Sequence, residues 1–319
     1  MNTRHLYYFM WLFIIGSVIF INNCAPRAKL PVMRPAEINL KGTNKIIIGD
    51  IDGNIGTNVA DLVSSRLFET GQFDIIDRSN LNKMLNEQSL NLSGAVDSDT
   101  AIKVGKLIGA SALITGSANK KCDVKKWRQE PYKDNNGNWH QSHFRSITAK
   151  VNSTLKVIDM STGKVLAVKN ISKENSDSDG ADNRCPDGPD EDVLITKGMT
   201  DMVDTFMKMI APYTEHVEIV FEKSDLPESE VGFNYAMRGM WKDALEQFTA
   251  AKDKNPTDAG AWFNMGLAYE YSYMFEEAIN AFKEAYRLDP SESRYIEEIS
   301  NVKRLQDERK KLEQQGCIN

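Results

Sequence analysis

The chain has 319 residues, of which 41% are hydrophobic and 26% are charged, so it is long enough for two globular domains. Its net charge is −6, whereas a general nucleic-acid-binding protein usually carries a basic surface. The composition therefore excludes wholesale disorder, and we expect no nucleic-acid partner.

The first residues predict an exported protein. A positively charged start, residues 1–5, precedes a mostly apolar run over 6–21, which would rise about 24 Å as a helix, less than the ~30 Å of membrane hydrocarbon. We therefore predict a signal peptide over 1–23. Cys24 follows, as at a bacterial lipoprotein processing site, where the cysteine takes a diacylglycerol, although Asn23 replaces the usual small residue. An uncleaved signal anchor and a plain secretory signal are the alternatives, and all three place the body outside the cytoplasm.

Residues 24–43 are rich in Pro and charge and are predicted to be a tether. The pattern then alternates short apolar runs with helical stripes, which indicates an α/β domain over 44–222. Predicted strands cover 45–50, 72–78, 110–118, 147–157, 165–171 and 216–222, and predicted helices cover 57–70, 80–90, 101–108 and 199–210.

This domain offers no evident catalytic group. The loop with Gly49, Gly53 and Gly56 follows a strand and precedes a helix, but it has neither the Lys nor the spacing of a phosphate-binding loop. No Ser, Cys or His nucleophile arrangement lies near its carboxylates in the sequence. We therefore expect no enzymatic activity and no cofactor.

Residues 68–120 contain G-x-F-x-I-I-x-R, L-x-x-x-L-x-E-Q and G-K-L-I-G-A-x-x-L-I-x-G. This segment resembles the curli-secretion (CsgG-like) lipoprotein family, and the resemblance extends over about 44–222. It implies a mixed-sheet α/β (α+β) domain facing the periplasm from an outer-membrane lipid anchor. Channel-forming members of the family use two long membrane-crossing hairpins, and other members are adaptors.

Two charged insertions favour an adaptor. Residues 119–146 hold seven Lys or Arg and three acids, while residues 172–192 hold eight acids and two basic residues, with no strand-forming run in the second insertion. Charges facing lipid cost a few kcal/mol each, so we predict that both insertions are solvated loops outside the membrane.

The two insertions carry further candidate sites. Each has one cysteine, and together with the opposite charges this predicts a Cys122–Cys185 disulfide between neighbouring loops. Asp177, Asp179 and Asp182 are a weak calcium candidate, because the run lacks the bidentate Glu of an EF-hand loop. A solvated or salt-paired loop is the alternative, and no other metal site is expected.

A 34-residue period within 225–292 is that of tetratricopeptide (TPR) helix pairs. The sequence therefore predicts an all-α domain over 225–315, made of two repeats and a charged capping helix. Six residues recur in register: Gly232, Tyr235, Ala244, Phe248, Ala251 and Pro256 match Gly266, Tyr269, Ala278, Phe282, Ala285 and Pro290.

The inner groove of these repeats is the predicted partner site. It would present Phe233, Met237, Phe263, Leu267 and Glu270 to an apolar partner helix, without the Lys/Asn pattern of carboxylate-clamp repeats. The alternative is that the capping helix or the first domain covers these side chains.

Together these features predict an outer-membrane-anchored, periplasm-facing lipoprotein that acts as an adaptor in envelope biogenesis or secretion. Its first domain would dock on partner proteins or form homo-oligomers, while the repeats bind an envelope protein. The alternative function is a subunit of a curli-type secretion channel.

Overall fold

A computed structural model describes residues 25–40, 42–43, 45–76, 98–109 and 111–318. Two compact units divide the chain. We name residues 34–213 with the last residues from 311 the sheet unit, and residues up to 33 with 214–310 the repeat unit. The predicted signal peptide, Cys24 and the helix predicted at 80–90 lie outside the described residues.

The sheet unit contains a five-stranded mixed sheet in the order β3-β2-β4-β7-β8. Strand β2 pairs in parallel with β3 and β4, whereas β4–β7 and β7–β8 are antiparallel. The mixed α/β class predicted from the sequence is thus confirmed. The strands are β2 (Lys45–Asp52), β3 (Asp74–Ile76), β4 (Ala112–Arg128), β7 (Ser142–Asp159) and β8 (Val165–Asp182).

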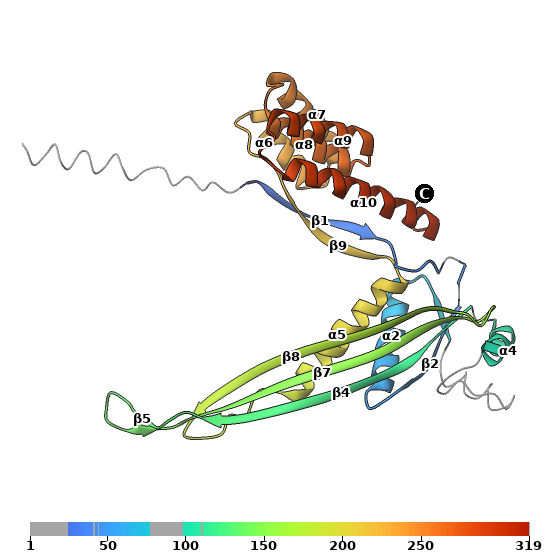
Figure 1. Cartoon of the computed structure of the whole chain (residues 1–319), viewed down its shortest axis with the longest axis vertical. Coiled ribbons are helices and arrows are strands. Elements are labelled where there is room, and N and C mark those ends of the chain that lie inside the picture. The colour runs from blue at the N-terminus through green and yellow to red at the C-terminus, as the bar shows by residue number, and fades with distance from the viewer. Residues whose placement is uncertain (1–24, 41, 44, 77–97, 110, 319) are drawn as a thin grey trace, which may run out of the picture. The chain divides into compact units, whose positions relative to one another are not determined.

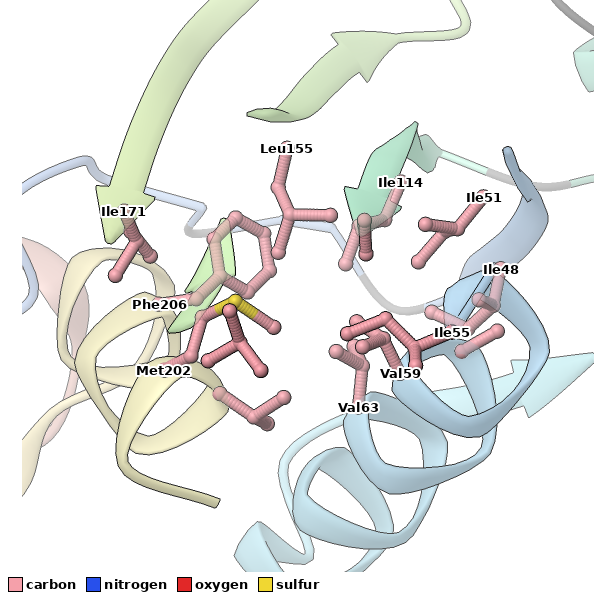
Figure 2. Close-up of a cluster of buried hydrophobic side chains, with 14 of the residues drawn as sticks. Ile48, Ile51, Ile55, Val59, Val63, Ile114, Leu155, Ile171, Met202 and Phe206 are labelled. Atoms are coloured by element: carbon pink, nitrogen blue, oxygen red, sulfur yellow. The ribbon is translucent and has the colours of Figure 1, made fainter. Parts of the chain in front are cut away.

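Helices α2 (Gly56–Thr70) and α5 (Glu191–Ile210) pack on one face of this sheet. Figure 2 shows the apolar side chains of both helices, such as Val63 and Phe206, converging on strand residues such as Leu155. All three side chains are fully buried, and this apolar burial fixes the helices on the sheet. Gly71 ends α2 in the left-handed conformation (φ 64°), which glycine adopts without steric cost.

The opposite face of the sheet carries a smaller core under α4 (Ser98–Ile108). Ile47 and Leu113 point to this side and pack with Ala101 and Val104. Because neighbours along a strand alternate, Ile46 and Ile48 point instead to the larger core. This alternation explains why β2 is apolar on both faces.

The charged insertions are not loops, which corrects the sequence prediction. Strand β4 runs to Arg128, β7 starts at Ser142, and β8 continues to Asp182, so the insertions lengthen three paired strands. Figure 1 shows these strands side by side, with the short β5–β6 hairpin (Tyr132–Lys133 and Trp139–His140) beyond them. Charge did not prevent strand formation because the ladder uses backbone groups and the charged side chains remain in solvent.

The repeat unit contains a two-stranded sheet, β1 (Arg27–Arg34) and β9 (Tyr213–Val220). The predicted tether therefore contains a strand, because Ala28 and Leu30 alternate with exposed cations and bury in the core of this unit. The strand predicted at 216–222 also forms, but it pairs with β1 rather than with the main sheet.

The predicted helical repeats are present. They comprise α6 (Pro227–Ala236), α7 (Trp241–Lys254), α8 (Ala259–Tyr271) and α9 (Phe275–Leu288), followed by α10 (Arg294–Gln315). A methyl group on Gly232 or Gly266 would lie 2.6 Å from Phe248 or Phe282, respectively. The recurring glycine thus allows each helix pair to approach closely.

We expect Gly266→Ala to lower the free energy of unfolding of the repeat unit. Overpacking against Phe282 costs about 1–3 kcal/mol, which exceeds the ~1 kcal/mol gained in helix propensity. Urea unfolding followed by circular dichroism measures the change. Lys283→Ala, on the exposed face of α9, is the control, and equal stability of the two variants would contradict the packing argument.

Candidate protein-interaction site

The strongest candidate site is the groove of the repeats, which holds a segment of the chain itself. Phe221 follows β9 and is fully buried. Its ring centroid lies 5.2 Å from that of Phe233 and 5.9 Å from that of Phe248, and Phe233 and Phe248 are 5.4 Å apart. These three rings form one aromatic cluster, so the segment after β9 is anchored in the first repeat.

Asn264 holds the next residue by its backbone. Its side-chain Oδ1 accepts a hydrogen bond from the Glu222 N–H (2.8 Å), and its Nδ2 donates to the Glu222 carbonyl (2.9 Å). Asn264 is fully buried in α8, so these two bonds satisfy an amide that would otherwise be costly to bury. Recognition of this kind binds extended backbone without reading the side chain.

The side chain of Glu222 is bound separately. Its carboxylate forms an ion pair with Arg294, which also donates a hydrogen bond to the Val220 carbonyl (3.2 Å). The Arg294 guanidinium lies over the Phe263 ring at 4.7 Å from the centroid. A methyl group on Gly260 would lie 3.0 Å from the Glu222 side chain, so the glycine leaves room for the segment.

Four of the five predicted groove residues are therefore covered by the chain. Phe233, Phe263, Leu267 and Glu270 are each at most 7% exposed, whereas Met237 is 47% exposed. Phe221 contacts Phe233, and the Tyr295 ring of α10 lies 5.0 Å from the Phe263 ring. Burial raises the pKa of Tyr295 to about 12, which keeps this phenol neutral against the ring.

Sequence reasoning missed Asn264 and Arg294. The available signal was a lone amide within the otherwise apolar run Ala261–Ala268, since a buried Asn must have hydrogen-bond partners. Arg294 gave no such signal, because the capping helix is densely charged throughout.

The predicted disulfide does not form, and Cys122 and Cys185 are free. Cys122 lies opposite Ala149 in the ladder, whereas Cys185 lines a cleft with Trp127. Trp127 lies five positions along the strand from Cys122, a rise of about 17 Å, whereas bridged cysteines have Cα atoms within ~7 Å. The extension of β4 thus keeps the cysteines apart.

The three calcium-candidate carboxylates are not brought together. They lie on β8, where Asp177 and Asp179 share one face and Asp182 points to the other. Asp182 accepts hydrogen bonds from the Ser142 and Tyr132 hydroxyls, and the Ser142 bond is the main cause of its lowered pKa. Within the described part of the chain, no three His, Cys, Asp or Glu side chains are grouped as metal ligands would be.

A cleft of about 340 Å³ lies near the outer ends of β4 and β7. The Trp127 and Phe144 rings stack there at 5.3 Å. The lining has cationic groups but no carboxylate, so its chemistry suits an anion better than a metal ion. The residues are Lys126, Trp127, Arg128, His143, Phe144, Arg145, Cys185 and Pro186.

Residues 39–183 match the family model "Curli production assembly/transport component CsgG", and residues 259–292 match the tetratricopeptide repeat model. The chain contains a CsgG-family domain followed by a tetratricopeptide repeat. The strands β2 to β8 and helices α8 and α9 lie largely within these two matches. No curated protein matches the chain.

Several solved structures resemble the chain at low identity. The LpoB C-terminal domain from Escherichia coli has 10% identity and a TM-score of 0.27, over 41% of this chain and 82% of that one. The PelC dodecamer from Paraburkholderia phytofirmans has 13% and 0.26, over 57% and 99%. Lipoprotein GNA1162 from Neisseria meningitidis has 12% and 0.26, over 51% and 97%.

None of the helices among the described residues is long and apolar enough to cross a membrane.

We expect Asn264→Ala to destabilise the repeat unit by about 1–3 kcal/mol, because the Glu222 N–H and carbonyl both lose their partner. Urea unfolding of the chain without its first 24 residues gives the difference. Asn234→Ala is the matched control, since the exposed Asn234 bonds only within its own helix. Similar unfolding of the two variants would show that Asn264 does not hold the segment.

We expect Cys185 to react with iodoacetamide before Cys122 in the folded protein at pH 8. Cys185 is exposed, whereas burial and the neighbouring Glu191 raise the pKa of Cys122, which lowers its thiolate fraction. Peptide mass spectrometry after timed alkylation measures both rates. A Cys122–Cys185 linked peptide in unreduced protein would contradict the structure.

Proposed function

We propose that this chain is a non-enzymatic adaptor lipoprotein of the bacterial envelope, anchored to the outer membrane through Cys24 and facing the periplasm. It would bind protein partners of envelope biogenesis or secretion through its CsgG-family domain and its repeats. The domain matches support an envelope role, and the lipoprotein-like N-terminus supports the anchor.

One observation carries the adaptor proposal: the groove of the repeats already binds an extended peptide. Asn264 binds its backbone, and Arg294 binds its carboxylate. A partner would displace this segment, or bind beside it at the exposed Met237. The repeats therefore already contain the polar groups that binding of an extended peptide requires.

The test is site-specific photo-crosslinking in intact cells. A benzophenone amino acid at Met237 should yield defined protein adducts, because this groove residue is exposed. The same amino acid at Lys283, on an exposed position of α9, is the control and should yield none. Absence of adducts at Met237, or identical adducts at both positions, would overturn the repeats as the partner site.

The second candidate function is a secretion-channel subunit, and the length of β4, β7 and β8 favours it. These strands occupy the insertions that would have to cross lipid. Against it, the outer part of β4 places charges on both faces, with Lys121, Asp123 and Lys125 on one and Lys126 on the other. Each Lys facing lipid at the midplane costs about 2–4 kcal/mol.

We therefore expect no ion conductance from the purified protein in planar lipid bilayers. The outer strands should also remain accessible to protease in the lipid-anchored protein, with cleavage after exposed residues such as Lys133. Discrete conductance steps together with protection of this region would favour the channel over the adaptor.

A further inference from the structure

We propose that the repeat unit is held directly against the membrane surface that carries the lipid anchor, rather than at the end of a flexible tether. The inference rests on the proposed lipid modification of Cys24. It concerns the repeat unit alone and follows from where β1 begins and what holds it.

Very little chain separates the anchor from the folded repeat unit. The Pro26 carbonyl accepts a hydrogen bond from the Phe221 N–H at 2.9 Å. Pro26 lies two residues after Cys24, and two extended residues span at most about 7 Å. A diacylglycerol-modified Cys24 would therefore lie at most about 7 Å from Pro26, the residue that bonds to Phe221.

The connection at Pro26 is firmly fixed. Phe221 is buried among the aromatic rings of the first repeat, and Asn264 holds the backbone of the following residue. Ala28 and Leu30 of β1 are buried in the same core. Detachment of β1 into a flexible tether would expose these apolar side chains to water, and the hydrophobic effect disfavours this exposure.

The exposed side of β1 is polar and can lie at the headgroup surface of a membrane. Arg27 and Lys29 alternate with the buried residues and point to solvent. Arg27 pairs with Glu218 at 3.2 Å, yet both side chains remain more than half exposed. Strand β9 exposes Glu215 and Glu218 beside these cations, so the short link to the acyl anchor, rather than net charge, makes the lipid surface the occupant of this face.

A free tether would behave differently. A flexible 20-residue segment over 24–43 has a root-mean-square reach of about 25 Å, which would leave the repeats free of the membrane. With β1 folded, a partner that reaches the groove must lie at the same membrane surface.

The test uses the full-length lipidated protein in vesicles of phosphatidylethanolamine and phosphatidylglycerol that carry a headgroup nitroxide. The protein has Cys122, Cys185 and Cys317 replaced by Ser and a fluorophore on Lys29→Cys. The matched control inserts 15 Gly/Ser residues between Ala25 and Pro26, which adds a reach of about 21 Å. We expect strong quenching at the native spacing and loss of most of it after the insertion.

The outcomes separate the two proposals. Mass spectrometry of the N-terminal peptide reports acylation, and Cys24→Ser should leave the protein off the vesicles. An unmodified Cys24 overturns the anchor and this inference together. An acylated protein with no quenching at Lys29→Cys, or with quenching unchanged by the insertion, overturns the membrane contact of the repeats and leaves the lipid anchor standing.

Discussion

The packing of Phe221 and Glu222 against the repeats is the contact that joins the two-stranded sheet to the helices of the repeat unit. The aromatic cluster buries the side chain of one residue, while Asn264 and Arg294 bind the backbone and carboxylate of the next. Burial supplies most of the stabilisation, and the hydrogen bonds fix the register. Because the Phe221 N–H also donates a hydrogen bond to the Pro26 carbonyl, this contact fixes the start of β1 on the repeats.

The sheet unit obeys a different constraint, the antiparallel pairing of β4, β7 and β8. Near α5 the helix-facing side of these strands is apolar, with Ala149 and Val151 buried. Farther out, charged and polar residues lie on both faces, and the backbone ladder continues the sheet with few apolar contacts such as the Trp127–Phe144 stack. The strands therefore extend far beyond the core that stabilises their inner halves.

These two arrangements bear on function in different ways. The repeats hold an extended segment of their own chain. Of the five predicted partner residues, only Met237 remains exposed. A partner must therefore displace the bound segment or bind beside it. The paired strands offer a long, polar and solvated surface, which suits docking between proteins better than contact with lipid.

The sequence by itself determined the repeats and the α/β order, because helical periodicity and a glycine that recurs every 34 residues can be read from the chain alone. It did not determine the fate of the charged insertions, since strand pairing depends on a distant partner's backbone rather than on side-chain polarity. Only the tertiary structure separated Cys122 from Cys185, and only it joined β1 to β9. It also placed Phe221 in the groove, because long-range contacts leave no periodic signal in the chain.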